Sequence, residues 1–401
     1  MSNPGSMFRI FLLIGSGVVA AAQIGKAIIS IPFIRADMDI GLGVAGLIVA
    51  TFATLGASTG VGLGAVVERL GVRRSLVGGM GLIAAGNLIG AAAPDASILL
   101  AARIVEGIGF FGAVLAIPST LARVVDENRR DFVMAAWSAY MPTGIMLMLL
   151  LGPLLASVGW RAIWQFNALL AAACSLLLAL YAPELPRRTD IAAGHLLTQV
   201  ARVLRHRQSV TLAIAFFAYS CQIFSMAFAL PLVLTSAHGV ALGSAGLLSA
   251  AVLAVSAAGH VLSGFLLRAG VPIWANVAAS FCVFALSASA VYGEMVPAVV
   301  VGLAAALALG VGGFAPGALY AAAPRVALDQ RAIPATIGML QQASNLGQFI
   351  GPLVLAMWVQ NAGWQRAPVI IVPMALLGLA AALVIRRQGE PATSGTIVHK
   401  A

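Results

Sequence analysis

Residues 64–76 read GAVVERLGVRRSL, a short basic segment with two glycines that separates two long apolar stretches. Residues 42–66 before it and residues 75–94 after it carry almost no charge. About 20 apolar residues in a helix are enough to cross a hydrocarbon core of roughly 30 Å. Each flanking stretch is therefore predicted to be a membrane-spanning helix, and the basic segment a tight turn at one surface of the bilayer.

The same alternation of apolar stretch and short polar loop continues along all 401 residues. Hydrophobic residues make up 61% of the chain and charged residues only 9%, which is not the composition of a soluble domain. We predict an all-α membrane protein with twelve transmembrane helices. The predicted spans are residues 8–33, 42–66, 75–94, 97–124, 131–157, 160–182, 209–235, 242–267, 272–292, 296–323, 332–360 and 365–385.

The 23 Lys and Arg residues gather on one side of this arrangement. With both termini on that side, only Arg35, Arg161 and Arg366 fall at the opposite surface, and Lys26 and Arg103 lie within the membrane. Basic segments near the ends of spans stay in the cytoplasm. The sequence thus predicts a multi-pass protein of the cytoplasmic (inner) membrane with both termini inside. Short basic loops beside anionic lipids account for the net charge of +10, so membrane lipids and not nucleic acid are the expected partners.

One long polar segment divides the chain into two sets of six spans. The predicted units are an N-terminal six-helix bundle at residues 1–182, a cytoplasmic linker with an amphipathic basic helix at 183–208, a C-terminal six-helix bundle at 209–386 and a cytoplasmic tail at 387–401.

The two sets of spans also resemble each other in sequence. GPLLASVGWR begins at Gly152 and GPLVLAMWVQNAGWQR begins at Gly351, so the Gly-Pro, Gly-Trp and Arg elements recur about 200 residues apart. Parallel repeats of this kind are related by a pseudo-twofold axis along the membrane normal and enclose a cavity at their interface. We expect two pseudo-symmetric bundles that rock about such a cavity.

The segment at residues 64–76 resembles the signature loop of the major facilitator superfamily, G-x-L-A-D-R-x-G-R-K-x-x-L. Gly64, Arg69, Gly71, Arg73 and Leu76 match the pattern, and Glu68 replaces its aspartate. The resemblance implies the major facilitator fold and transport by alternating access. It also implies an inner gate, made of Gly64, Glu68, Arg69, Gly71 and Arg73; the alternative is a loop that is merely basic.

The fourth span resembles the superfamily element R-x-x-x-G-x-G through Arg103, Gly107 and Gly109. Arg103 and Glu106 are three residues apart and share a helix face. Charges at membrane depth are costly unless they are paired or hydrated, so we expect both to face the cavity. Arg103 is a predicted substrate-binding residue and Glu106 the predicted proton-coupling residue; a static ion pair between helices is the alternative.

Lys26 lies within the first span at a similar depth. We predict that it binds substrate and pairs with Glu106 when the cavity is empty; snorkelling to the interface is the alternative. Neutral polar residues complete the predicted binding set, namely Tyr140, Gln222, Tyr320, Gln341 and Asn345. His260 is a weaker candidate because the sequence shows no partner for it.

The sequence contains no enzyme signature such as a P-loop, G-x-S-x-G or H-E-x-x-H. Cys174, Cys221 and Cys282 all lie in spans without metal-ligand spacing. We therefore predict no enzymatic activity, no metal and no cofactor. Transport would use an ion gradient, unless the protein is a facilitator.

Two further segments, WSAYMPTG at residues 137–144 and GHVLSGFLLRAGVP at residues 259–272, are similar to the cyanate and nitroimidazole permease branch. That resemblance implies proton-coupled secondary transport of a small, often anionic, organic or inorganic solute. We also expect the transporter to work as a monomer. The alternatives are proton-driven efflux of amphipathic drugs or metabolites and a non-transporting membrane sensor.

Overall fold

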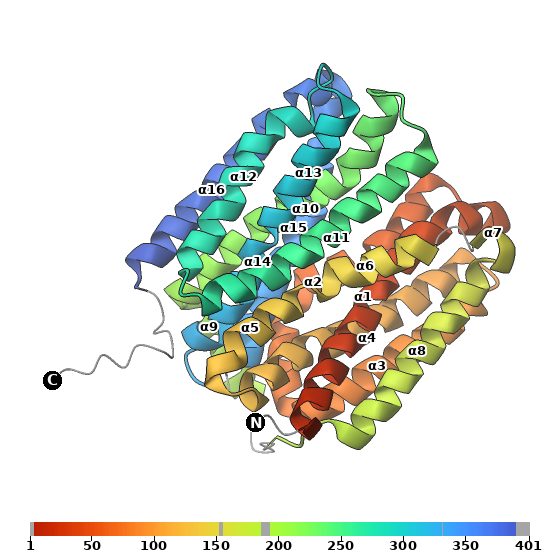
Figure 1. Ribbon diagram of the computed structural model, residues 1–401. Coiled ribbons are helices and arrows are strands. Elements are labelled where there is room, and N and C mark those ends of the chain that lie inside the picture. Colours follow the sequence, from red (N-terminus) through yellow and green to blue (C-terminus); the bar gives the residue numbers. More distant parts are fainter. Residues whose placement is uncertain (1–3, 152–154, 186–192, 331, 390–401) are drawn as a thin grey trace.

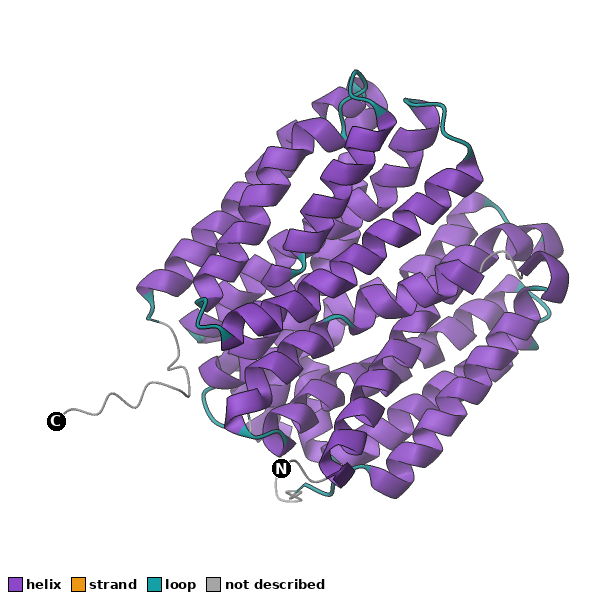
Figure 2. Cartoon of the chain, in the orientation of Figure 1, coloured by secondary structure: helices purple, strands orange, loops and turns teal. Residues whose placement is uncertain are grey.

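The structure is a computed structural model that describes residues 4–151, 155–185, 193–330 and 332–389, apart from some side chains within helices. The regular elements of these residues are helices joined by short loops (Figure 2). The helices of the first half are α1 (Pro4–Met38), α2 (Leu42–Leu70), α3 (Val72–Ala91), α4 (Ala96–Val124), α5 (Glu127–Ser138), α6 (Tyr140–Leu151), α7 (Leu155–Val158) and α8 (Trp160–Tyr181). The remaining helices are α9 (Ala193–Arg205), α10 (Arg207–Ser236), α11 (Leu242–Arg268), α12 (Ile273–Val291), α13 (Ala298–Gly312), α14 (Phe314–Val326), α15 (Ile333–Ala362), the short 3-10 helix η2 (Trp364–Arg366) and α16 (Pro368–Arg387).

Nine segments of the described residues are long and apolar enough to cross a membrane, with α5–α6 and α13–α14 each forming one of them. Helices α2, α3 and α15 pack among these segments and are 29, 20 and 30 residues long. Together they give twelve spans at the positions that the sequence predicts.

The helices form two groups that lie side by side (Figure 1). Helices α1, α3, α4 and α8 pack against one another, as do α10, α12, α15 and α16. The groups meet where α2 packs on α15 and where α5 and α6 pack on α11. The predicted boundaries at residues 182, 208 and 386 stay predictions, and Gly152, which opens the first repeat, lies outside the described residues.

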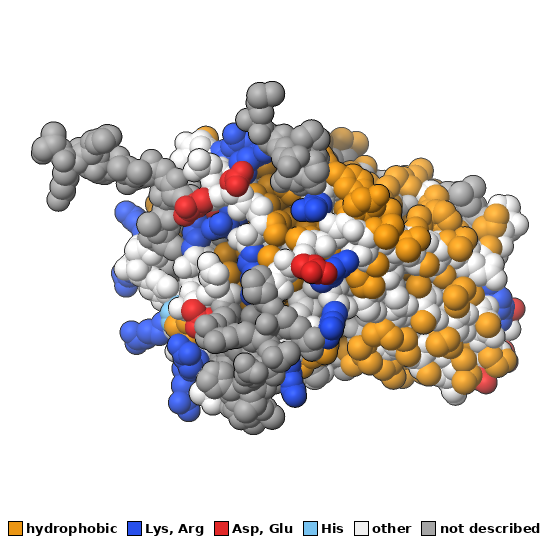
Figure 3. Space-filling model, turned by 90° about the horizontal axis from the view of Figure 1, so that it is seen from below, with side chains coloured by type: hydrophobic (Ala, Val, Ile, Leu, Met, Phe, Trp, Pro, Cys, Tyr) orange, Lys and Arg blue, Asp and Glu red, His pale blue; other side chains and the backbone are white. Residues whose placement is uncertain are grey.

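The start of α1 and the end of α16 lie at the same end of the molecule, which we call the terminal face (Figure 1). Lys and Arg side chains gather there beside a broad apolar surface (Figure 3). The exposed arginines near these helix ends are Arg9, Arg69, Arg74, Arg129, Arg202, Arg205, Arg207, Arg268, Arg386 and Arg387. The basic loops thus share one face, as the charge pattern predicts.

Near the terminal face, α2 and α15 approach so closely that a side chain would not fit between them. A Cβ atom added at Gly64 would overlap the backbone carbonyl of Pro334 and would lie 3.0 Å from the Cα of Ala335. Deeper along the same interface, a Cβ at Gly56 would lie 2.6 Å from the Cγ of Asn345. The two halves are therefore in tight backbone contact on this side.

We predict that Gly64→Ala lowers the melting temperature, because the added methyl group must push α2 from α15 at a cost of about 1–3 kcal/mol. Gly62→Ala is the matched control, since it lies on the same helix with nothing within 4 Å of an added Cβ. There alanine should be neutral or slightly stabilising. Thermal unfolding in detergent measures both variants, and equal melting temperatures would contradict the tight α2–α15 contact.

Candidate functional site

A cavity of about 740 Å³ lies between the two groups of helices. Its walls come from α1, α2, α5 and α6 on one side and from α10, α11, α13, α14 and α15 on the other. Gly46 and Gly246 line it near the starts of α2 and α11, so the cavity extends toward the face opposite the terminal face. Its described lining is mostly apolar and aromatic, with several neutral polar side chains, and includes no Asp, Glu, Lys or Arg.

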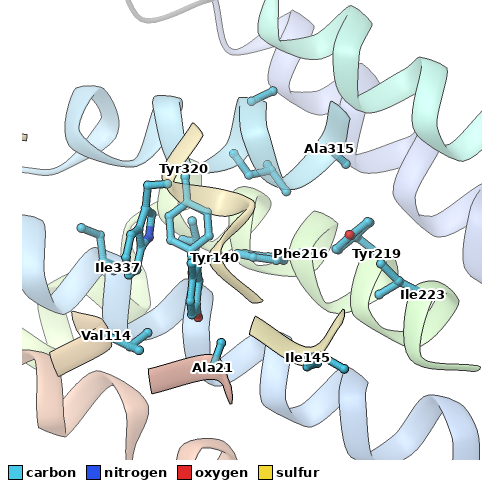
Figure 4. Close-up of a cluster of buried hydrophobic side chains, with 14 of the residues drawn as sticks. Ala21, Val114, Tyr140, Ile145, Phe216, Tyr219, Ile223, Ala315, Tyr320 and Ile337 are labelled. Carbon is cyan, nitrogen blue, oxygen red and sulfur yellow. The ribbon is translucent and has the colours of Figure 1, made fainter. Parts of the chain in front are cut away.

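Three of the predicted binding residues meet in this cavity. Tyr320 on α14 donates its hydroxyl to Oε1 of Gln341 on α15 at 2.8 Å, and Tyr140 on α6 donates to the same oxygen at 3.4 Å. Figure 4 shows both tyrosines beside Phe216, whose ring meets that of Tyr320 edge-on at 5.3 Å. Trp137 stacks on Tyr140 at a centroid distance of 4.2 Å. Residues from both halves thus form one aromatic and hydrogen-bonding wall.

Two other predicted binding residues lie behind the cavity lining. Gln222 donates its amide to the backbone oxygen of Ile371 at 3.1 Å, which points its side chain toward α16. Asn345 donates to the backbone oxygen of Gln341 at 2.6 Å and packs against Gly56. Neither lines the cavity, because each side chain is used between helices. A substrate contact for either residue stays a prediction.

The charged residues form a cluster inside the N-terminal half. Lys26 on α1 and Arg103 on α4 both pair with Glu106 on α4, with 2.8 Å between Lys26 Nζ and Glu106 Oε1. All three side chains are completely buried. We expected these side chains to face the cavity, but they do not line it. The Glu106 carboxylate pairs with both cations inside the bundle, so their charges are compensated without contact with water. Direct binding of substrate by Lys26 and Arg103 stays a prediction.

A chain of neutral polar side chains extends the cluster. Lys26 Nζ donates to Asn87 Oδ1, Asn87 donates to Gln23 Oε1 at 2.8 Å, and Gln23 donates to Asn167 Oδ1 at 3.2 Å. Lys26 Nζ also lies 3.7 Å from the ring centroid of Trp164. The sequence analysis missed these partners, although three buried amides in apolar spans were a visible signal. Every buried amide here has a hydrogen bond, which reduces the cost of desolvation.

Glycines on α3 make room for this cluster. A Cβ at Gly86 would lie 2.6 Å from the Cγ of Glu106, and a Cβ at Gly90 would overlap the indole ring of Trp164. The close approach of α3 to α4 and α8 brings Asn87 within reach of Lys26. Small residues on α3 therefore determine where the charged side chains can meet.

Arg103 also ties the cluster to two helices beside the cavity. Its Nε donates to the backbone oxygen of Ile48 on α2 at 3.1 Å, and its guanidinium donates to that of Gln23 on α1 at 3.2 Å. Ile24 and Val49, the next residues on those helices, line the cavity. A change in the charge of Glu106 would thus act on two segments of the cavity wall.

Two of the five predicted gate residues, Arg73 and Gly71, contact their own half. Arg73 pairs with Glu184 and donates to the backbone oxygen of Ala179 at 2.6 Å, which joins α3 to the end of α8. Gly71 has a φ of 85° and makes the sharp turn between α2 and α3 that glycine allows. Arg69 is exposed, and the side chain of Glu68 lies outside the described residues. Gly64 contacts the opposite half at Pro334.

An ion pair that the sequence analysis missed also joins the halves near the terminal face. Asp131 on α5 pairs with Arg325 on α14, and both side chains are mostly buried. Arg123 at the end of α4 donates to the backbone oxygen of Gln330 at 3.1 Å. The signal was present, because LARVVDENRRD and APRVALDQRA follow corresponding spans and hold these charges.

Residues 12–327 match the family model described as Major Facilitator Superfamily, and the chain belongs to this superfamily. The galactose-proton symporter of Escherichia coli (strain K12) is 28% identical over 185 residues, which cover 45% of this chain and 39% of that protein. The methylenomycin A resistance protein of Streptomyces coelicolor is 34% identical over 145 residues, which cover 34% and 30%. The matched regions thus span about two fifths or less of these relatives.

Solved structures support the same fold over nearly the whole chain. The human organic anion transporter MFSD10 has a TM-score of 0.79 and 17% identity, covering 95% of this chain and 100% of the other. The proton:xylose symporter XylE has a TM-score of 0.74 and 15% identity, covering 95% and 96%. The predicted all-α membrane fold is confirmed, and the chain is a multi-pass membrane protein of a superfamily of transporters and not of enzymes. Sugar symporters and resistance proteins both occur among the relatives, so no single branch is indicated.

We predict that Glu106→Gln strongly destabilises the protein, since it leaves Lys26 and Arg103 buried without a counter-charge. Breaking a buried pair in this way costs about 3–5 kcal/mol. Adding Lys26→Met to that variant should recover part of the loss. The control is Asp37→Asn, which breaks the half-exposed pair with Arg161 and should change little. Chemical or thermal unfolding measures all four proteins; an equal effect of Glu106→Gln and Asp37→Asn would contradict the cluster.

We predict that Asp131→Ala opens the terminal face more often, because it removes the ion pair between the halves. The readout is the labelling rate of a cysteine placed at cavity residue Ser344, in a background without native cysteines, by an impermeant maleimide applied from the terminal face. Exchanging the two charges at Asp131 and Arg325 should restore the slow rate. Glu184→Ala, which breaks a pair within one half, is the control. A labelling rate for Asp131→Ala no faster than this control rejects the gate role.

Proposed function

We propose that this chain is a proton-driven exporter of amphipathic organic solutes, drugs or metabolites, that works by alternating access. The observation that carries the proposal is the cavity, which is apolar and aromatic and has no charged residue in its described lining. An amphipathic molecule gains free energy by burying apolar surface in such a pocket. A small anion has little apolar surface to bury there and would lose its hydration without a nearby cation at the wall.

Glu106 is the residue to which we assign the coupling proton. Its carboxylate is completely buried and holds Lys26 and Arg103 in place. Protonation would remove the negative charge and weaken both ion pairs. Arg103 also holds the backbone of α1 and α2 beside the cavity. Uptake of a proton would therefore loosen the cavity wall, which is the link between ion and substrate that secondary transport requires.

The relatives support both parts of this proposal by their names. One is named a methylenomycin A resistance protein, which favours export, and another a galactose-proton symporter, which favours proton coupling. We further propose that the terminal face is cytoplasmic, because basic segments stay inside. The protein would then lie in the cytoplasmic (inner) membrane, with both termini inside, and work as a monomer.

A small anionic solute, as in the cyanate and nitroimidazole permease branch, is the second candidate substrate. The observation that favours it is the composition of the cluster, in which two cations share one carboxylate. An anionic group that reached Lys26 would compete with Glu106 and supply the missing charge. Lys26 lies only two residues from Ile24 and Ile28, both of which line the cavity.

Transport by proteoliposomes separates these candidates. We predict that wild-type protein moves ethidium against its gradient only when a proton gradient is imposed. Glu106→Gln should lose this accumulation, whereas Glu184→Gln, an exposed carboxylate on the terminal face, should keep it. Flux of cyanate or benzoate without flux of ethidium would favour the anionic candidate and contradict export of amphipathic solutes. Full proton-driven accumulation by Glu106→Gln would overturn the coupling assignment.

A further inference from the structure

His260 on α11 lines the cavity and is held rigidly in place. A Cβ at Gly313, between α13 and α14, would lie 2.6 Å from its Nδ1, and a Cβ at Gly317 would lie 3.0 Å from its backbone oxygen. His260 is 2% exposed, and the sequence alone indicated no partner for it. Backbone packing therefore fixes the direction in which the ring presents its second nitrogen.

The hydrogen bonds of His260 determine which nitrogen accepts. Nδ1 lies 2.7 Å from the backbone oxygen of Ser256. A carbonyl oxygen only accepts, so Nδ1 must carry the hydrogen, and in the neutral ring Nε2 is left as an acceptor. The hydroxyl of Tyr219 lies 3.4 Å from Nε2, a long contact that uses this acceptor weakly.

Most of the other polar groups of the cavity already have a hydrogen-bond partner. Oε1 of Gln341 accepts from both Tyr140 and Tyr320. The hydroxyls of Ser220 and Ser344 pair at 2.8 Å. Gln348 also lines the cavity and carries an amide oxygen. His260 Nε2 is the nitrogen acceptor of the described lining, and its one internal contact, to the Tyr219 hydroxyl, is long. Aromatic rings stand beside it, since Tyr219 lies edge-on to His260 at a centroid distance of 6.3 Å.

We propose that His260 accepts a hydrogen bond from an N–H or O–H group of the substrate and so determines specificity. The preferred solute has an aromatic or apolar body that packs on the rings of the cavity, and a donor at its edge that reaches Nε2. This assignment rests on the proposed function, because it requires an amphipathic solute in the cavity. A site built around one hydrogen bond discriminates against analogues that lack the donor, because the buried acceptor is then left unpaired.

The test compares two lipophilic aromatic monocations, ethidium and tetraphenylphosphonium, of which only ethidium carries N–H donors. Binding to purified protein in detergent is measured by isothermal titration calorimetry. We expect His260→Leu to weaken ethidium about tenfold or more and to change tetraphenylphosphonium by less than about twofold. His260→Gln, which keeps an acceptor, should recover much of the ethidium affinity. Tyr219→Phe removes the competing hydroxyl and should leave ethidium binding equal or tighter.

The outcomes distinguish a failure of the role assigned to His260 from a failure of the proposed function. Equal weakening of both probes by His260→Leu would show that His260 only supports the cavity wall and would overturn the assignment. Loss of ethidium binding in Tyr219→Phe would show that the hydroxyl of Tyr219 is itself needed for binding and would overturn the assignment too. Unchanged ethidium affinity in His260→Leu would overturn it as well. If wild-type protein binds neither probe, the proposed function fails first, and the role of His260 falls with it.

Discussion

The N-terminal half depends on one buried carboxylate. Glu106 contacts both Lys26 and Arg103, and none of the three side chains reaches solvent. In the described state the carboxylate is the counter-charge that offsets the cost of burying both cations, and Asn87 and Gln23 add hydrogen bonds around Lys26. Helices α1, α3, α4 and α8 are thereby fixed to one another by polar contacts, in a bilayer where apolar packing alone gives little specificity.

The charged cluster of Lys26, Arg103 and Glu106 lies apart from the cavity in which we propose that substrate binds. The cluster lies within one half, whereas the cavity between the halves is lined by aromatic and apolar residues. Arg103 connects the two through the backbone of α1 and α2, and α2 in turn packs on α15 across the interface. Near the terminal face the halves are closed by the Gly64–Pro334 contact and the Asp131–Arg325 pair. A change in the ion pairs of the cluster can therefore move α2, which contacts both the cavity and the closed terminal face.

Much of the fold follows from the sequence, because span length and the placement of arginines are local properties. Tyr140, Tyr320 and Gln341 were each named from the sequence, and the structure brings them together at the cavity. The position of Lys26 and Arg103 behind the cavity could not be predicted from the sequence, because helical periodicity does not show which neighbouring helix a buried helix face packs against. The packing of α3 against α4 and α8 depends on Gly86 and Gly90, and it determines where these side chains lie. The Asp131–Arg325 pair joins residues 194 positions apart, so only a comparison of the two corresponding segments could have indicated it.

Infrared difference spectroscopy of the Glu106 carboxyl group tests the central claim most directly. Spectra of the reconstituted protein are recorded with and without a transported solute, for wild type and for Glu106→Gln. The account predicts that solute changes the carbonyl band of a protonated carboxylic acid in wild type and that this band is missing from the variant. An identical difference spectrum in both proteins would contradict the assignment of the coupling proton to Glu106.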